Sequence, residues 1–441
     1  MVRLAGNGDK SALAPYTRRV DKILNTIRPL IPRRLFRAAQ PAYHYALALA
    51  GKILYQRRYR RLRILGVTGT KGKTTVTELA AAALSGGGLK VAVANGIRFA
   101  VDGRYERKAK QSMPGRLELP RFLLDAAGAG CDWAVVEMTS EGAAQFRHLP
   151  IALDALVVTN LAPEHLEAHG SFEAYREAKM KIVRALRPRD GKAPTLIVNG
   201  DDLECAAFAD VGKKLGASVV EVKFNSDVET DERGVSVKIG NAAVRSPLAG
   251  THNAKNILLA AAAARAAGVS DSAITHGIAA VTKIPGRGER VEQGQPFSVV
   301  VDYAHTPDSL EAIFGTYTGK RRICVFGSAG GGRDRWKRPE MGSVAARLCD
   351  VVILTEDDSY NEDPAEIIAE IAAGTAGKAQ IVLDRREAIR LALSLAKPGD
   401  AVIVAGMGAQ EEIRRAAGPE PWSDATVCRG ELAKLGYGSR K

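Results

Sequence analysis

The sequence has few cysteines and lacks the long apolar runs of membrane-spanning helices. Its five cysteines lie far apart, with no CxxC pair: Cys131, Cys205, Cys324, Cys349 and Cys428. This spacing argues against a zinc site and a disulfide framework, and it favours reduced thiols in a cytoplasm. The longest apolar stretch, 43–55, contains Lys52 and is shorter than the roughly 18 residues that a membrane span needs. The first ten residues do not resemble a secretory signal, so we expect a cytoplasmic protein.

The net charge of +14 is concentrated at the beginning of the chain. Residues 1–62 contain fourteen Lys or Arg and only two acids, Asp9 and Asp21, so this segment carries +12. The other 379 residues are close to neutral, at +2. An enzyme that acts on nucleic acid would spread basic residues around its site. We therefore expect no nucleic-acid partner.

Apolar runs that alternate with helical patterns predict an α/β fold with mostly parallel sheets. The buried strands that we predict in a central domain are 63–67, 133–138, 155–160 and 195–200. Short antiparallel strands are predicted in 221–244, and a helix in 253–267. The pattern then restarts with predicted strands at 297–304, 321–328, 351–358, 379–384 and 400–406.

Three domains follow from these patterns. We expect a basic helical segment at 1–61, a P-loop-type central domain at 62–283 and a Rossmann-like C-terminal domain at 284–441. Prolines should break the first segment into two or three helices, at Pro15, Pro29, Pro32 and Pro41. Each of the two larger domains has an ordinary domain size.

The strongest chemical signal is the loop GVTGTKGKTT at 66–75, between a predicted strand and a predicted helix. Glycines let backbone N–H groups close around phosphate oxygens, and the helix N-terminus adds a favourable dipole. Lys73 would neutralise phosphate charge, and the Thr74 hydroxyl could ligate Mg²⁺. Val67 stands where a strict P-loop has its first glycine. The nucleotide-binding residues that we predict in this loop are Gly69, Thr70, Lys71, Gly72, Lys73, Thr74 and Thr75.

Three further residues are candidates for a metal site. Glu137 ends a predicted strand, where a carboxylate points into the ligand crevice of an α/β sheet, although it could also be a solvated loop acid. His165 lies in NLAPEHLEAHG, which ends the next strand, and a lone histidine is more often structural. Lys179 lies in the helix that follows, where a lysine is usually solvated.

The order and spacing of these motifs resemble the Mur ligase family, and within it the UDP-N-acetylmuramyl-tripeptide synthetases. The motifs are GTKGKTT, Glu137, PEHLEAHGSFEAYREAK, AGTHNAKN, PGRGE, DYAHTPD, GSAGGGRDRWKRPEMG and NEDP. The resemblance extends from about residue 62 to the C-terminus. It implies an ATP-dependent ligase that activates a carboxylate as an acyl phosphate, joins it to an amine and releases ADP and phosphate. The cofactors implied are ATP and Mg²⁺.

The resemblance also assigns site residues by position. Lys179 matches a carbamylated lysine, which would be an anionic metal ligand; Glu137, His165 and Thr74 match the other magnesium ligands. Catalysis is thus assigned to Lys73, Lys179, His165 and Glu137. Further nucleotide-binding positions are Asn253, Asn256, Arg287, Asp302 and His305. Substrate-binding positions are Ser112, Met113, Pro114, Thr139, Ser140, Lys337, Arg338, Asp357 and Asp358.

The implied partners are a small-molecule or lipid-linked cell-wall precursor and an amino acid, with the protein acting as a monomer. A folylpolyglutamate- or cyanophycin-type ligase shares the same core, but DYAHTPD and PEHLEAHG favour the Mur branch. An amidotransferase partner of the MurT type normally has a four-cysteine zinc site, which this sequence lacks. A P-loop protein that is non-catalytic or depends on nucleic acid is the alternative from another class.

Two departures from the family pattern bear on the substrates. Diaminopimelate-adding members have a DNPR motif, whereas this chain has Asp357-Asp358-Ser359-Tyr360, and its 406–411 loop lacks the family lysine. We therefore expect discrimination against diaminopimelate, unless this loop is merely structural. Only about 62 residues precede the P-loop strand, without the α/β pattern of a uridine-binding domain. Residues 1–61 form either a basic cap on the core or a contact with an anionic membrane, and loop 111–116 would bind the acceptor.

Overall fold

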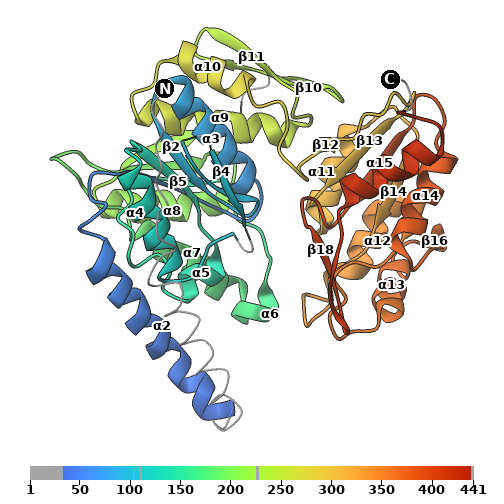
Figure 1. The fold of residues 1–441 in the computed structure, drawn as a ribbon, viewed down its shortest axis with the longest axis horizontal. Coiled ribbons are helices and arrows are strands. Elements are labelled where there is room, and N and C mark those ends of the chain that lie inside the picture. The colour runs from blue at the N-terminus through green and yellow to red at the C-terminus, as the bar shows by residue number, and fades with distance from the viewer. Residues whose placement is uncertain (1–32, 103, 110–111, 225–227, 439–441) are drawn as a thin grey trace, which may run out of the picture.

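The computed structural model describes residues 33–438, except 103, 110–111 and 225–227 (Figure 1). Within this part the chain forms a central unit around one large sheet and a C-terminal unit around a second sheet. The helix α2 (Arg33–Tyr55) precedes the central sheet. The α/β fold with mostly parallel sheets is confirmed. Among the described residues, no helix is long and apolar enough to cross a membrane.

The central sheet has eight strands in the order β4-β3-β2-β5-β1-β6-β7-β8. They are β1 (Arg63–Thr68), β2 (Val91–Ala94), β3 (Arg98–Val101), β4 (Arg104–Lys108), β5 (Trp133–Glu137), β6 (Ala155–Val158), β7 (Thr195–Asn199) and β8 (Ser218–Val222). Strands β2, β5, β1, β6, β7 and β8 run parallel, and β3 and β4 continue the sheet in antiparallel orientation. The phosphate loop therefore leaves the middle of the sheet. Strands β2, β3 and β4 were not predicted from the sequence.

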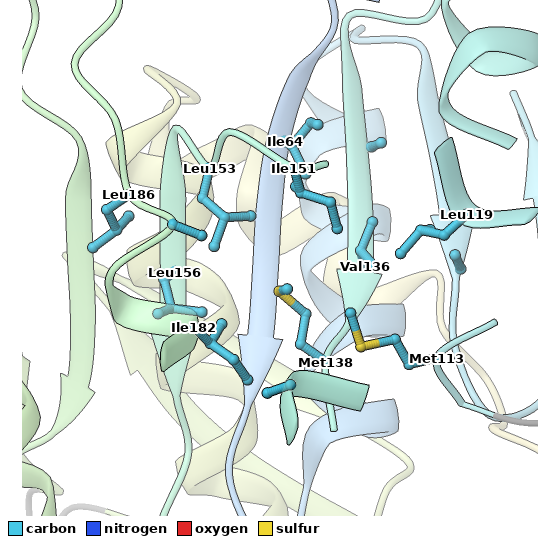
Figure 2. Packing of buried hydrophobic residues seen from close by; sticks show 14 of the residues in the cluster. Ile64, Met113, Leu119, Val136, Met138, Ile151, Leu153, Leu156, Ile182 and Leu186 are labelled. Carbon is cyan, nitrogen blue, oxygen red and sulfur yellow. The ribbon is translucent and has the colours of Figure 1, made fainter. Parts of the chain in front are cut away.

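Alternating side chains of the strands form two cores, one on each face of this sheet. Ile64 points to one core and Leu65 to the other, as the two-residue period of a strand requires. Figure 2 shows the first core, where Ile64, Val136 and Leu156 meet residues of the covering helices and loops. The helices of this unit are α3 (Lys73–Gly86), α4 (Glu118–Gly128), α5 (Ser140–Ala144), α6 (Leu166–His169), α7 (Phe172–Val183), α8 (Leu203–Lys214), α9 (Thr251–Ala266) and α10 (Asp271–Ala279).

Three short strands form a separate antiparallel sheet, as the alternation in 221–244 predicted. They are β9 (Glu229–Asp231), β10 (Gly234–Ile239) and β11 (Ala242–Ser246). Glu221 itself lies in β8 of the main sheet, because its strand pairs in parallel with β7. The apolar side of β10 packs with α9 and α10 in the second core.

The C-terminal sheet has six strands in the order β12-β13-β17-β14-β15-β16, all parallel except β12. Its elements are β12 (Glu289–Arg290), β13 (Ser298–Asp302), α11 (Pro307–Thr316), β14 (Arg322–Phe326), α12 (Lys337–Leu348), β15 (Val351–Leu354), α13 (Pro364–Ala372), β16 (Ala379–Ile381), α14 (Arg385–Leu395), β17 (Ala401–Ala405) and α15 (Asp424–Lys434). A hairpin that the sequence did not predict consists of β18 (Glu412–Arg415) and β19 (Gly418–Pro421).

Helix α2 differs from the expectation at Pro41, because the helix continues through this residue. Its Ala48 and Tyr55 are buried, and Gly51 lies so close to the start of α4 that a Cβ atom would approach the carbonyl oxygen of Arg116 to 2.9 Å. Packing of this small-residue face on the body of the protein stabilises the helix against the loss of a hydrogen bond at proline. Pro15, Pro29 and Pro32 lie outside the described residues.

Candidate functional site

The phosphate loop joins β1 to α3 in a conformation that requires two of its glycines. Gly69 and Gly72 have φ angles of +140° and +81°. A Cβ atom on Gly72 would meet Oδ1 of Asn256 at 2.4 Å, and one on Gly69 would meet Oγ1 of Thr159 at 1.9 Å. The backbone can therefore curl between Thr159 and Asn256 only because Gly69 and Gly72 have no side chain. The curl leaves the N-terminus of α3 directed at the cleft, as an anion site needs.

Cationic side chains gather around this loop. The ammonium group of Lys73 donates to the carbonyl of Thr70 at 2.8 Å, and burial lowers the pKa of Lys73. Burial also lowers the pKa of Lys337, which comes from the C-terminal unit. The guanidinium of Arg287 reaches the hydroxyl of Thr74 at 3.4 Å and stacks 4.5 Å from the centre of the Tyr303 ring. Several cations brought together around one glycine loop favour an anionic ligand such as a triphosphate.

Thr74 and Glu137 bring two oxygen donors together beside the loop. The Thr74 hydroxyl donates to Oε2 of Glu137 at 2.8 Å, and the same oxygen accepts the backbone N–H of Gly96 at 3.1 Å. Glu137 is buried at the end of β5, where the sequence predicted a crevice carboxylate. Hydroxyl and carboxylate oxygens are ligands that Mg²⁺ prefers, so this pair fits a magnesium ion next to bound phosphate.

Lys179 lies beneath the phosphate loop rather than on the surface of α7. Its side chain is 2% exposed, and its nitrogen donates to the carbonyl of Gly69 at 2.7 Å. The same nitrogen lies 4.7 Å from the centre of the Tyr175 ring. Burial, followed by the nearby charge of Lys73, holds the pKa of Lys179 well below its usual value. As an amine this side chain is not a metal ligand, but its low pKa makes it nucleophilic.

His165 begins α6 in a left-handed conformation with a φ of +57°. Its Nδ1 lies 3.9 Å from carboxylate oxygens of both Glu141 and Glu167, and burial lowers the pKa of the ring. Within the described residues, no group of three or more His, Cys, Asp or Glu side chains is arranged to hold a metal. Thr74 and Glu137 thus fit a first magnesium ion, whereas a second ion at His165 would need an additional oxygen ligand.

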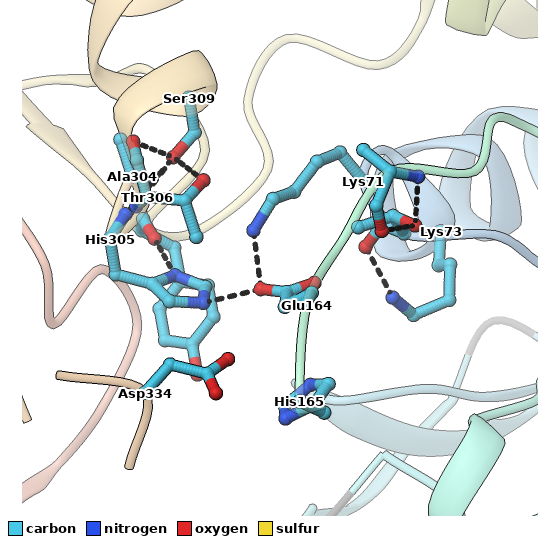
Figure 3. A network of polar contacts seen from close by, with 12 residues as sticks. Lys71, Lys73, Glu164, His165, Ala304, His305, Thr306, Ser309 and Asp334 are labelled. Atoms are coloured by element: carbon cyan, nitrogen blue, oxygen red, sulfur yellow. Dashed lines mark hydrogen bonds and ion pairs between the residues drawn. The ribbon is translucent and has the colours of Figure 1, made fainter. Parts of the chain in front are cut away.

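A network that the sequence did not predict connects the two units across the cleft (Figure 3). Oε1 of Glu164 accepts from the ammonium of Lys71 at 2.5 Å and lies 3.0 Å from Nε2 of His305. Despite its burial, the positive charge of Lys71 and the contact with His305 hold the pKa of Glu164 well below its usual range. Nearby, the Asp334 carboxylate accepts the backbone N–H groups of Leu166 and Glu167. Glu164 thus connects the phosphate loop to the C-terminal unit.

Residues predicted to hold the nucleoside lie on both sides of the loop. Asn256 contacts the phosphate loop through Gly72 and donates to Oδ1 of Asn253 at 3.1 Å. Asp302 ends β13, and its two carboxylate oxygens accept the backbone N–H groups of Gly288 and Ala304 at 2.7 Å each. Burial raises the pKa of Asp302. These four contacts hold Asn256 and Asp302 at the cleft.

The other end of the cleft contains two buried acids, Asp357 and Asp358. Asp357 is 5% exposed, and burial raises the pKa of its carboxyl group. The Asp358 carboxylate accepts from the side-chain amide of Gln410 at 2.9 Å and from the backbone N–H of Arg414 at 2.8 Å. Arg414 also lines the cleft, and its guanidinium donates to Glu412. The sequence pattern did not single out Arg414, because it lies 56 residues from Asp358 along the chain.

Two parts of the predicted acceptor region meet between α4 and α5. Met113 is buried against Gly142, and the Arg147 guanidinium donates to the carbonyl of Met113. The Thr139 hydroxyl caps α5 by accepting from the backbone N–H of Gly142. Arg147 also lines the cleft and was not predicted. Gln111, which begins the predicted acceptor loop, lies outside the described residues.

Arg338 is placed differently from the expectation that it approaches phosphates or substrate. It is fully buried, and its guanidinium donates to Glu362 at 2.9 Å and to Glu370 at 2.8 Å. A third bond goes to the carbonyl of Ala329. Two carboxylates therefore compensate its charge inside the C-terminal unit, and the neighbouring Lys337 is the cation that reaches the cleft.

One cleft of about 1750 Å³ contains most of the predicted residues. Those that line it are Thr70, Lys71, Gly72, Lys73, Thr74, Thr75, Ser112, Met113, Glu137, Thr139, Ser140, His165, Asn253, Asn256, Arg287, Asp302, His305, Lys337, Asp357 and Asp358. Gly69, Pro114, Lys179 and Arg338 do not line it. Lys179 instead lies beneath the phosphate loop, where its nitrogen donates to the carbonyl of Gly69 within the loop.

Comparison with known protein families matches two regions of the chain. Residues 67–264 match the Mur ligase middle domain, and residues 286–408 match the Mur ligase, glutamate ligase domain. Both matches lie within the predicted domains 62–283 and 284–441, whose boundaries stay predictions.

Two relatives are similar over most of the chain. A UDP-N-acetylmuramyl-tripeptide synthetase of Roseiflexus sp. (strain RS-1) is 39% identical, over 90% of this chain and 84% of the relative. A UDP-N-acetylmuramoyl-L-alanyl-D-glutamate--2,6-diaminopimelate ligase of Syntrophomonas wolfei subsp. wolfei (strain DSM 2245B / Goettingen) is 36% identical, over 83% and 78%.

Two solved structures share the fold. A UDP-N-acetylmuramoyl-L-alanyl-D-glutamate--2,6-diaminopimelate ligase has a TM-score of 0.59 at 29% identity, over 85% of this chain and 79% of that chain. A folylpolyglutamate synthase of Mycobacterium tuberculosis, solved with ADP and AMPPCP, has a TM-score of 0.68 over 90% and 95%. Its identity of 18% shows the fold alone.

Proposed function

The chain belongs to the Mur ligase family and is an ATP-dependent amide ligase, and on this premise we propose that it adds a diamino acid to a muramyl dipeptide. One observation carries the proposal: a single cleft has a cationic phosphate loop at one end and the buried acids Asp357 and Asp358 at the other. The two ends match a triphosphate and an ammonium group. The acceptor class follows the name of the Roseiflexus relative.

The phosphoryl transfer uses the cations of the loop. ATP and Mg²⁺ are the cofactors of this family, and bound magnesium supplies charge neutralisation at the phosphate oxygens. Lys73 and Arg287 place positive charge beside Thr74, where they stabilise the γ-phosphate as a carboxylate oxygen of the acceptor attacks its phosphorus. The bond to the β-phosphate oxygen breaks, ADP leaves and an acyl phosphate forms.

The amide bond forms when an amine attacks the carbonyl carbon of the acyl phosphate and inorganic phosphate leaves. Residues of both units surround the place of this step, because Glu164 and His305 connect them at 3.0 Å. Further closure of the C-terminal unit over the bound substrates would exclude water, which would otherwise hydrolyse the acyl phosphate.

For the magnesium ligands we propose Thr74, Glu137, His165 and a carbamylated Lys179. The low pKa of Lys179 supports this assignment, because only an unprotonated amine can add carbon dioxide. The carbamate would supply an anionic oxygen ligand to an ion that His165 also binds. Adenine and ribose are proposed to contact Asn253, Asn256, Asp302 and Arg287.

For the incoming amino acid we propose a diamine such as lysine, with meso-diaminopimelate disfavoured. Tyr360 stands at the position of the DNPR arginine, and the acids Asp357 and Asp358 line this end of the cleft. The Arg414 guanidinium is already bound to Glu412. A carboxylate on the side chain would therefore meet two acids, whereas an ammonium group could pair with them.

An assay of ADP release tests the reaction. We expect release to require both UDP-muramyl dipeptide and lysine, and to be unchanged by added DNA or RNA. An amino-acid panel then separates the substrates. A preference for meso-diaminopimelate that disappears in Arg414→Gln would overturn the diamine proposal and would assign the carboxylate contact to Arg414. Release that needs neither acceptor nor amino acid would contradict the ligase reaction itself.

A further inference from the structure

A basic face of the protein lies at the edge of the central sheet opposite the phosphate loop. Arg57, Arg58, Arg60 and Arg61 are exposed in the turns between α2 and β1. They precede the first residue of β1, whereas the phosphate loop follows its last residue. A six-residue strand separates the two by about 17 Å. These arginines are therefore too far from the phosphate loop to contact a nucleotide there.

A second segment, distant in sequence, extends this face. The Arg189 guanidinium donates to the carbonyl of Leu62 at 2.8 Å. Arg187, two residues earlier, is exposed, and its guanidinium donates to main-chain carbonyls of its own turn. The arginines of the 57–61 turn thus lie beside those of the 184–189 segment. Three acids lie near them. Asp154 pairs with Arg189 and Glu177 with Arg184, and the exposed Asp190 directly follows Arg189.

Exposed aliphatic side chains adjoin the arginines along α2. Ile53 is 70% exposed and Leu54 57% exposed, and Leu49 lies one turn before Ile53. The opposite side of the helix, with Ala48 and Tyr55, is buried against the protein. Figure 1 shows α2 projecting from the central unit on the side away from the C-terminal unit. The apolar residues thus face outwards, where a partner can reach them.

We propose that this face, formed by α2 from Leu49 and by the arginines of 57–61 and 184–189, binds the surface of an anionic lipid bilayer. Residues 39–62 contain five Lys or Arg and no acid, which complements phospholipid headgroups. The aliphatic side chains distinguish a membrane from nucleic acid, because they enter the acyl boundary while the arginines remain among the headgroups. A polynucleotide offers no such apolar layer.

Vesicle co-sedimentation of the full chain tests the proposal. We expect binding to vesicles that contain phosphatidylglycerol and none to pure phosphatidylcholine. Binding should weaken as the salt concentration rises, because the Debye screening length then shortens. Replacing Arg57, Arg58, Arg60 and Arg61 by Gln should weaken the partition coefficient by about fivefold for each arginine at low salt. The double variant Ile53→Gln/Leu54→Gln should weaken it by about tenfold.

Matched variants control for nonspecific charge and apolar effects. Arg233→Gln/Arg347→Gln removes two exposed arginines elsewhere, and Leu203→Gln/Ile381→Gln removes two exposed aliphatic residues. Both should bind vesicles as the parent protein does. All variants should keep the far-ultraviolet circular dichroism of the parent and its ADP release without vesicles.

Three outcomes would overturn the proposal. Equal binding to both kinds of vesicle would show that charge complementarity is not the cause. Unchanged binding by Ile53→Gln/Leu54→Gln would exclude insertion of α2. Loss of vesicle binding on addition of stoichiometric DNA or RNA would assign the face to nucleic acid.

Discussion

The two ends of the cleft contain buried charges of opposite sign. At the phosphate loop, burial lowers the pKa of Lys73 and of Lys179. At the end of the cleft that the C-terminal unit forms, burial raises the pKa of Asp357. In both places the loss of water disfavours the charged form, and a ligand of the opposite sign would restore it. The comparison teaches that burial disfavours the charged state at both ends, which suits the ligands proposed above, phosphate at one end and an ammonium group at the other.

The largest effect is expected from the phosphate end. Lys73→Met should reduce kcat for ADP release on the order of 10³-fold, because the developing phosphoryl charge loses a fixed cation. The melting temperature should not fall, since the variant removes a cation whose burial is unfavourable. Steady-state kinetics and thermal unfolding measure the two effects. Lys378→Ala, an exposed lysine, is the control. If Lys73→Met had the kcat of the parent enzyme, the phosphate loop would not stabilise the transferred phosphate through Lys73.

A variant of Lys179 tests whether this side chain acts as an unmodified amine or as a carbamate. We expect Lys179→Ala to reduce ligation about 10²-fold or more with the fold intact, and short carboxylates to restore part of it by filling the ligand position. The lowered pKa favours the free amine, which adds carbon dioxide, and protonation at lower pH opposes this addition. Bicarbonate depletion should therefore inhibit the parent enzyme more strongly as pH falls. Mass spectrometry under bicarbonate and the control Lys213→Ala complete the test. Full activity in bicarbonate-free buffer would contradict the carbamate.

The acidic end should affect amino-acid binding and not ATP binding. Asp358→Asn removes one charge and leaves a single acceptor oxygen for its two donors, Gln410 and the backbone N–H of Arg414. We expect KM for lysine to rise about tenfold while KM for ATP stays unchanged. The exposed Glu366→Gln in α13 is the matched control. If both KM values rose together, the two ends would not be independent.

The smallest effect is expected on stability, when Glu164, which contacts both Lys71 and His305, is replaced. Glu164→Gln removes the ion pair with Lys71, and we expect a loss of about 1 kcal/mol in the free energy of unfolding. The pKa of Glu164 is lowered in the folded protein, so its contribution is present above the unfolded value and is lost as pH falls through the folded value. Denaturant unfolding of parent and variant should therefore differ at pH 7 and converge in acid. A constant difference at every pH would exclude an ionic origin.

Much of the fold could be predicted because its strands are local apolar runs. The predicted strands at 63–67 and 133–138 correspond to β1 and β5, which pair in the middle of the sheet. The strands β2, β3 and β4 and the hairpin β18–β19 were not predicted, because strands of four or five residues are too short for a distinct sequence pattern. Pro41 was misleading because tertiary packing outweighs the local effect of one proline.

The sequence by itself determined the chemistry of the phosphate loop, since its glycines, lysine and threonine are adjacent and their backbone conformation is a local property. Only the tertiary structure decided which distant charges meet. Glu164 meets His305 across 141 residues, Lys179 reaches Gly69 across 110, and Arg338 turns away from the cleft to Glu362 and Glu370. Spacing along a chain does not fix distance in space, so these pairings follow from the sheets that carry them.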